Sequence, residues 1–276
     1  MVQYLEMLEH VLSRGKFKSG TKGGGTLSVL GYQANYDLTE GFPLITSRSL
    51  EGKPWRALVY ELLWFLSGST NVKDLHANNV HLWDPWATPE ISQKHGLPPG
   101  ELGPTYAHQW RSFNGGGDEP IDQIARVVAG IKKDADSNRN LVTALNPAEY
   151  EKVEIIPCHA VFHFYHYAGE LSMLLWQRSA DVPVGVPFNI AEYALLLMMT
   201  AQVTGLKPRE FVHQTSNTHI YADQIPKVKE LLQRKPKPLP QVRINPGVLD
   251  IFNFNYADFT LENYHPHPAM KIPVAR

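Results

Sequence analysis

The chain contains one cysteine, Cys158, which lies in the segment 156–160 just before a run of residues that alternates like a strand. A single cysteine excludes an intramolecular disulfide and a zinc site made of cysteines. An isolated cysteine is ordinarily a small buried side chain, and it acts as a nucleophile where a nearby cation lowers its pKa. Arg178 follows twenty residues later. The residues around Cys158 leave both roles open.

Arg178 and Ser179 end an expected strand and place a guanidinium beside a hydroxyl. Arginine can bind phosphate through two parallel hydrogen bonds, so this pair suits a phosphate group. An ion pair between Arg178 and Asp181 is the structural alternative. Lys22 precedes the glycines at 23–25 and can reach an anion, but these glycines precede an expected strand and do not form a P-loop.

Three further polar residues could recognise a ligand. Asn189 begins an expected apolar helix, where it is either an N-cap or an amide that reads a base edge with one donor and one acceptor. His219 and Tyr221 lie two residues apart on an expected extended segment, so their side chains point to one face. They either bind one ligand together or form a pair of satisfied polar core residues.

Glu61 lies inside a mostly apolar helical segment. A carboxylate in such a place must be paired, or it has a perturbed pKa that serves a function. We therefore expect Glu61 to be functional. His159, His163 and His166 alternate irregularly, and the chain has no His-Glu-x-x-His motif, so we expect no metal.

Hydrophobic periodicity predicts the elements that must position these side chains. We expect helices over 4–12, 55–66, 190–204 and 223–232, and strands over 27–36, 141–144, 161–167, 171–176 and 211–221. Segments rich in proline, glycine and asparagine, at 85–104 and 114–120, are expected to be loops. This mixed order of elements predicts an α+β or α/β fold and not a regular βαβ array.

Composition narrows the class of protein. The length of 276 residues suits one large domain or at most two, and a net charge of −1 indicates no broad surface for DNA or an anionic membrane. The chain opens directly into a helical pattern, so no signal peptide is expected. The longest apolar stretch, 190–199, contains Glu192 and is too short to span a bilayer. We expect a cytoplasmic protein with no DNA or membrane partner.

Eight motifs, in order along almost the whole chain, resemble those of the thymidylate synthase family. They lie at 61–66, 78–84, 102–111, 157–159, 177–182, 185–191, 218–221 and 266–268. The resemblance implies a single catalytic domain over 1–276 with a thymidylate-synthase-like α+β fold. In this fold, helices flank a large mixed β-sheet, and two copies form a homodimer through the sheet and share their active sites.

The resemblance also implies folate-dependent one-carbon transfer to C5 of a pyrimidine deoxynucleotide. The reaction would be methylation of dUMP to dTMP with 5,10-methylenetetrahydrofolate as co-substrate and no metal. Cys158 would attack C6 of the base, with Arg178 favouring the thiolate. Tyr106 would order the water that removes the C5 proton, and Glu61 would organise proton transfer.

The family's binding residues carry over to matching positions of this chain. Asn189 would read the O4/N3 edge of uracil, and the 3′-hydroxyl would fall to His219 and Tyr221. The phosphate would be bound by Arg178, Ser179 and Lys22, and by Arg139 lent from the other subunit. The folate would contact Trp83, Asp84, Asp181, Gly185 and Ala275, with Asp181 on the pterin and Trp83 as a wall.

The chain departs from the family at the expected phosphate site. Thr21 stands where the family has an arginine, with Lys22 beside it, and Asn138 with Arg139 replaces a pair of arginines. The chain ends in Arg276, where the family has an apolar residue. We expect the C-terminal segment to close over the site and Arg276 to replace part of the lost charge.

Other departures lie near the base and the folate. Glu192 replaces a small polar residue one turn after Asn189, Asn217 replaces an aspartate, Ala107 replaces a glycine, and the segment 47–55 is altered and slightly lengthened. Three alternatives therefore stay open: a hydroxymethylase in which water captures the methylene, a cytosine nucleotide as substrate, and a non-catalytic relative that binds nucleotide or RNA.

Overall fold

A six-stranded mixed sheet forms the centre of the structure, a computed structural model that describes residues 1–20, 22–114 and 119–275. In spatial order the strands are β1 (Lys16–Lys18), β2 (Thr26–Asp37), β6 (Lys207–Tyr221), β5 (Glu170–Asp181), β4 (His159–Tyr167) and β3 (Leu141–Thr143). β5 and β6 run parallel, and the other neighbouring pairs are antiparallel. Helix α7 (Gly185–Thr204) connects the parallel pair, because parallel neighbours need a crossover.

Strand β5 shows how the sequence builds a sheet with one face in the core. Leu171, Met173, Leu175 and Gln177 are buried, while the residues between them are only partly buried. Because burial repeats every two residues, alternate side chains point to opposite faces of the sheet. Gln177 is the polar member of the buried row, so the strand carries an amide into the core near its end.

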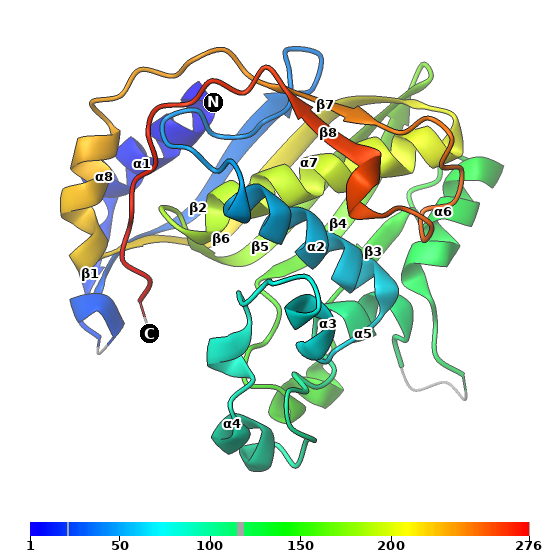
Figure 1. The fold of residues 1–276 in the computed structure, drawn as a ribbon, viewed down its shortest axis with the longest axis horizontal. Helices are drawn as coiled ribbons and strands as arrows, with labels where there is room; N and C mark the ends of the chain where they lie inside the picture. The colour runs from blue at the N-terminus through cyan, green and yellow to red at the C-terminus, as the bar shows by residue number, and fades with distance from the viewer. Residues whose placement is uncertain (21, 115–118, 276) are drawn as a thin grey trace.

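Helix α7 packs on the buried face of the sheet, against β5 and β6 (Figure 1). It is apolar on nearly all sides, and only the centre of a fold accommodates such a helix in water. It is also the one helix of the described chain that is long and apolar enough to cross a membrane, but 83% of its apolar window is buried inside the fold. That burial is typical of a core helix.

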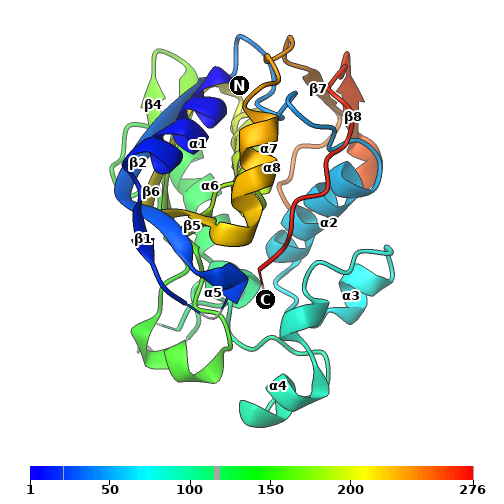
Figure 2. The ribbon, with the colours of Figure 1, turned by 90° about the vertical axis from the view of Figure 1, so that its left-hand side faces the viewer.

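Four further helices place the site residues. α1 (Val2–Arg14) packs on β2 and β6, and α2 (Lys53–Ser67) packs on α7 and on α5 (Tyr106–Arg111), while α6 (Gln123–Lys133) joins α5 to β3. Figure 2 shows α7, α8 (Ile225–Leu231) and α2 on the same side of the sheet. The C-terminal segment descends between α8 and α2 in that view.

Short elements complete the chain. They are α3 (Lys73–His76), α4 (Pro89–Lys94), the hairpin of β7 (Gln241–Ile244) with β8 (Phe259–Glu262), and the 3-10 turns η1 (Lys22–Gly24), η2 (Asp84–Trp86), η3 (Pro147–Lys152), η4 (Ala222–Gln224) and η5 (Tyr256–Asp258).

The structure confirms the expected α+β class and the large mixed sheet flanked by helices, and it corrects two boundaries. α7 begins at Gly185 and not at 190, since Pro187 is tolerated in a first turn where its missing N–H is not needed. Asn189 is therefore inside the helix, and its interpretation as an N-cap is wrong. β5 continues to Asp181, so Arg178 and Ser179 lie within the strand and not at its end.

The sequence analysis missed several elements. The expected loop 85–104 contains α4, and the expectations omitted α5 and α6 altogether. α6 carries a readable signal: the Asp122 side chain accepts from Ala125 N, and Ile124, Val127 and Ile131 form its buried face. α5 is too short to show periodicity, and its position depends on contacts with distant segments.

Candidate active site

Cys158 lies half-buried between η3 and β4, and the guanidinium of Arg178 reaches it from the neighbouring strand. Arg178 Nη2 is 3.7 Å from the sulfur of Cys158 and also donates to the carbonyl oxygen of Ile156 at 2.7 Å. The loop that holds the thiol thus also fixes the arginine. Arg178 therefore does not form the ion pair with Asp181 that the sequence left open, because that carboxylate has other partners.

The protonation state of the Cys158 thiol is set by two opposing effects. Burial raises its pKa, whereas Arg178 and the hydroxyl of Tyr106 lower it by a smaller amount. The net pKa lies above that of an ordinary thiol. The expectation that Arg178 favours the thiolate holds for the direction of its own effect, but burial outweighs it in the ligand-free protein.

Tyr106 lies beside Cys158, at the start of α5. The backbone N–H of Cys158 donates to the Tyr106 hydroxyl at 2.6 Å. The ring of Tyr106 is almost fully buried and stacks on His159, with 4.2 Å between ring centroids. Because the hydroxyl oxygen accepts from the backbone, its own hydrogen stays available for a group in the site.

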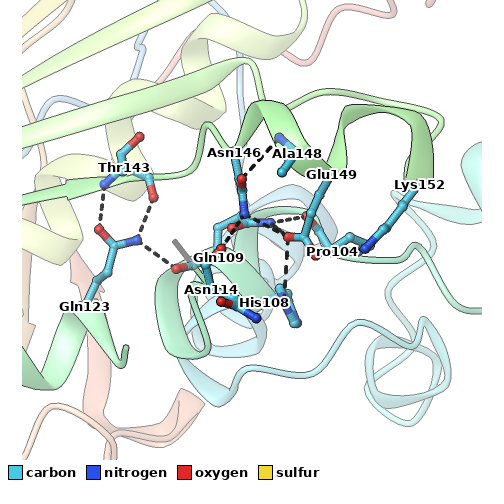
Figure 3. A network of polar contacts seen from close by, with 10 residues as sticks. All are labelled: Pro104, His108, Gln109, Asn114, Gln123, Thr143, Asn146, Ala148, Glu149 and Lys152. Carbon is cyan, nitrogen blue, oxygen red and sulfur yellow. Dashed lines mark hydrogen bonds and ion pairs between the residues drawn. The ribbon is translucent and has the colours of Figure 1, made fainter. Parts of the chain in front are cut away.

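A polar network ties α5 to the segment that leads into Cys158 (Figure 3). Gln109 of α5 donates to Glu149 of η3 at 2.8 Å, and the same carboxylate accepts from Asn146 at 3.0 Å. Gln123 donates to the backbone carbonyls of Gln109 at 2.8 Å and of Thr143 at 2.7 Å. These bonds fix the distance between Tyr106 and the Cys158 loop.

Two carboxyl groups meet between α2 and α7. Glu61 accepts from Trp83 Nε1 at 2.6 Å, and Glu192 is 2% exposed. Burial raises the pKa of both carboxyls, and the neighbouring Glu61 raises the pKa of Glu192 further. Since two adjacent buried carboxyls cannot both ionise, at least one of them holds a proton. The expected perturbation of Glu61 is therefore present.

The amide of Asn189 is oriented by a chain of forced hydrogen bonds. The carbonyl oxygen of Ser179 can only accept, so the Gln177 atom that lies 2.9 Å from it is the amide nitrogen. The same nitrogen is 3.1 Å from Asn189 Oδ1. The other end of Gln177 accepts from His213 Nε2 at 2.8 Å, and burial lowers the His213 pKa to about 3, so that ring is neutral.

Asp181 lies at the end of β5, close to the C-terminal segment. Burial raises its pKa to about 6, although Gln224 donates to it at 3.2 Å. Gln224 also donates to the carbonyl oxygen of Pro273 at 3.0 Å. A single amide therefore joins Asp181 to the C-terminal segment, in which Ala275 is partly buried. Arg276 lies outside the described residues.

His219 and Tyr221 share one face of β6, as their spacing predicts, with their ring centroids 5.1 Å apart. The turn η1 packs against the end of this strand. A side chain at Gly23 would lie 2.9 Å from Tyr221 Cβ, and the backbone there has a φ of +54°, so this close approach requires glycine. Lys22 is exposed beside it, while Thr21 lies outside the described residues.

Arg139 does not lie beside the Cys158, Arg178 and His219 side chains of its own chain. It is exposed just before β3, which is the edge strand farthest from β1 in the sheet order. Asn138 beside it is also exposed. Asp84 likewise has a different surrounding from the one expected, since both of its oxygens contact imidazoles, at 2.6 Å from His76 and 2.9 Å from His81.

His76, His81 and Asp84 are the one cluster of the described residues whose side chains could hold a metal. They lie at the surface, and hydrogen bonds between the carboxylate and both rings satisfy them without an ion. Sequence reasoning set His159 aside and overlooked Gln177 and His213. A signal for Gln177 and His213 was present in the sequence. Each is a polar residue among the buried positions of its strand, and the two strands, β5 and β6, are paired.

The family comparison agrees with this geometry. The family model described as thymidylate synthase matches residues 2–276, which is essentially the whole chain. The match covers every element that contributes a side chain to the site.

Proposed function

Because the chain belongs to the thymidylate synthase family, we propose that it methylates dUMP to dTMP with 5,10-methylenetetrahydrofolate as co-substrate. Membership supports the coarser activity, a folate-dependent transfer of a methyl or hydroxymethyl group to C5 of a pyrimidine nucleotide. One observation supports the covalent step on which this proposal depends. Arg178 Nη2 lies 3.7 Å from the Cys158 sulfur, while Tyr106 binds the backbone N–H of the same residue.

Cys158 acts as the nucleophile in this proposal. Its thiolate attacks C6, an S–C6 bond forms, and the electron pair of the C5–C6 double bond moves toward C5 and O4. Burial raises the pKa of the thiol in the free protein, and in this proposal a bound nucleotide shifts the balance toward the thiolate. Arg178 stabilises the thiolate at that moment. Linking activation to binding protects the thiol from unproductive reactions.

Three residues manage the base and its protons. Asn189 presents its NH2 group to O4 and its oxygen to N3–H, in the orientation that Gln177 imposes. Glu61, held by Trp83, organises proton transfer near O4. Tyr106 orders the water that takes the proton from C5.

The rest of the nucleotide is bound at the end of β6 and by a second subunit. His219 and Tyr221 hold the 3′-hydroxyl. Arg178, Ser179 and Lys22 bind the phosphate, together with Arg139 of the partner in a homodimer. The position of Arg139 supports a shared site, because it is exposed at the far edge of the sheet and cannot complete its own chain's site.

The residues proposed for the folate fit a flat heterocycle with amide-like N–H groups. Asp181 offers a partly buried carboxyl beside Gln224, and Trp83 and Trp86 present aromatic rings with centroids 5.6 Å apart. Gly185, Asp84 and Ala275 line the same region in the proposal. When bound, the folate supplies the one-carbon unit and, for methylation, the hydride.

Replacing the nucleophile tests this proposal. We expect Cys158→Ser to abolish turnover, since a serine hydroxyl is a far weaker nucleophile, while dUMP affinity changes little. Isothermal titration calorimetry with dUMP and a tritium-release assay from C5 measure the two quantities. Turnover by Cys158→Ser at the wild-type rate would contradict the assignment. A wild-type protein that does not bind dUMP would contradict the assignment of dUMP as the substrate.

Hydroxymethylation is a second candidate, which the Glu61–Glu192 pair favours. A buried pair of carboxyls can bind and orient a water molecule that captures the exocyclic methylene. The folate product separates the two reactions. Methylation releases dihydrofolate, whose absorbance rises in the near-ultraviolet, whereas hydroxymethylation releases tetrahydrofolate and gives no such rise.

A further inference from the structure

Two histidines and an aspartate meet at the surface beside the turn η2. His76 Nε2 lies 2.6 Å from one oxygen of the Asp84 carboxylate, and His81 Nδ1 lies 2.9 Å from the other oxygen. The two imidazole rings stack, with 4.8 Å between their centroids and 28° between their planes. Two ring nitrogens and one carboxylate are therefore gathered around one point, at which all three ligand atoms lie within 4.8 Å of one another.

The backbone fixes how His76 and His81 face each other. After α3 ends at His76, Asn79 takes a left-handed φ of +54° and reverses the chain. Asn79 N donates to the His76 carbonyl at 2.9 Å, and Val80 N donates to the Leu75 carbonyl at 3.1 Å, which is the Schellman end of a helix. Leu75 and Val80 are buried. Each histidine directly follows one of these buried residues, so the fold sets their spacing.

Asp84 is presented to both rings by a segment that is anchored in the core. It begins η2, where Pro85 restricts the backbone, and Ala87 N donates to its carbonyl at 3.2 Å. Trp83, just before it, is buried and donates its indole N–H to Glu61 at 2.6 Å. The carboxylate therefore has a fixed backbone position between the two histidines.

The spacing of the three side chains suits a small divalent ion. Zinc binds imidazole nitrogen and carboxylate oxygen at about 2.1 Å, so the ligand atoms of a tetrahedral site lie about 3.4 Å apart. The present nitrogen–oxygen distances need to open only slightly. The side chains of His76, His81 and Asp84 are 40%, 55% and 43% exposed, so they have room to do so. A neutral ring that donates N–H to the carboxylate binds the ion once its proton moves, through water, to the other ring nitrogen.

We propose that His76, His81 and Asp84 form a binding site for a divalent transition metal of the zinc type, separate from Cys158. Imidazole nitrogens suit zinc, nickel and copper, whereas Mg²⁺ and Ca²⁺ take oxygen ligands, so the site discriminates against the latter two. The ion joins the end of α3 to η2 and steadies the segment that carries Trp83. This inference goes beyond the proposed function and does not rest on it.

Titration calorimetry of the full chain with Zn²⁺, without an affinity tag, tests the site. We expect one ion per chain with a dissociation constant below about 100 μM, and no binding of Mg²⁺ in the same range. His81→Ala removes a ligand. Its affinity for Zn²⁺ should fall by about tenfold or more, since even residues that only support a ligand contribute that much. His265→Ala, an exposed histidine outside the cluster, is the matched control and should leave the affinity unchanged.

Zn²⁺ binding that His81→Ala leaves unchanged overturns the inference, as does binding at millimolar concentration only. Binding that persists in His81→Ala but is lost in Cys158→Ser also overturns it, because the ion then lies at the thiol. Thermal melting checks folding, and Zn²⁺ should raise the melting temperature of the wild type more than that of His81→Ala. Asp84→Asn, which keeps the size of the side chain, replaces His81→Ala if the latter unfolds. None of these results depends on turnover of dUMP, so failure here leaves the proposed function intact.

Discussion

The Cys158 thiol lies where burial and a nearby cation oppose each other. Burial raises its pKa, while the Arg178 guanidinium and the Tyr106 hydroxyl lower it by less. A sequence motif can place an arginine near a cysteine, but it cannot show which effect is larger. The structure gives the sign, and that sign determines how the free protein reacts with electrophiles.

Alkylation of the single cysteine should report this balance directly. We expect the rate of reaction with iodoacetamide to rise with pH and to reach its midpoint above the ordinary thiol pKa of about 8.5, since the thiolate is the reacting form. Arg178→Ala should move the midpoint to higher pH, because it removes the group that stabilises the thiolate. Mass spectrometry of the modified chain follows the rate.

Arg243→Ala, an exposed arginine on β7, is the control and should have no effect. A wild-type midpoint below the ordinary value would show that Arg178 dominates over burial. If Arg178→Ala left the midpoint unchanged, the guanidinium would have no effect on ionisation of the thiol.

Between elements, the network of Figure 3 determines how Tyr106 meets Cys158. Neither α5 nor the loop before β4 is rigid by itself, because α5 has six residues and the loop has no strand pairing until β4 begins. Gln123 of α6 joins α5 to the end of β3, where that loop begins, by bonding to the backbone of Gln109 and of Thr143. The precision of the site therefore depends on a residue that touches no ligand.

Gln123→Leu should weaken both the fold and the reaction. The change leaves the backbone groups at Gln109 and Thr143 without partners, and we expect a loss of about 2–3 kcal/mol in the free energy of unfolding. Turnover should fall more than dUMP affinity does. Urea denaturation and steady-state kinetics measure the two effects. Gln33→Leu, on the exposed side of β2, is the control. Equal losses of unfolding free energy and turnover in Gln123→Leu and Gln33→Leu would refute the role of the network.

Prediction from sequence succeeded where the signal was local. Alternation placed β4, β5 and β6, and apolar periodicity placed α1 and α2, although the true ends differ by a few residues. The spacing of His219 and Tyr221 correctly put their rings on one face. Each of these features depends on neighbours within one element.

Prediction failed where contacts join distant segments. The chain from Ser179 through Gln177 to Asn189 and His213 links two strands and a helix, and no spacing along the sequence encodes it. The expected start of this helix at 190 was also wrong, because α7 begins at Gly185 with Pro187 in its first turn, where proline is allowed.

For the whole molecule, the sheet has a face that the chain itself leaves partly open. Tyr165 and Tyr167 at the end of β4 are 60% and 70% exposed, and Leu30 of β2 is 89% exposed. Exposed apolar side chains on a sheet favour a second copy as the covering surface. A homodimer through this sheet would also bring a partner's Arg139 to the phosphate.

Mixing two inactive variants tests the shared site. Arg139→Ala and Cys158→Ala each remove one component of the site. When the two variants pair at random, half of the dimers are mixed, and each mixed dimer has one intact site out of two. We therefore expect recovery of about a quarter of wild-type activity after refolding together. Analytical ultracentrifugation confirms the dimer. Recovery no greater than the sum of the separate variants would show that Arg139 serves no site across an interface.

The most direct measurement is the mass of the nucleotide formed from dUMP and 5,10-methylenetetrahydrofolate. We predict dTMP, formed together with dihydrofolate and absent with Cys158→Ser. A 5-hydroxymethyl product with tetrahydrofolate would keep the Cys158 nucleophile and contradict methylation. Unchanged dUMP with wild-type protein that binds it would contradict the central claim that Cys158 attacks the uracil ring.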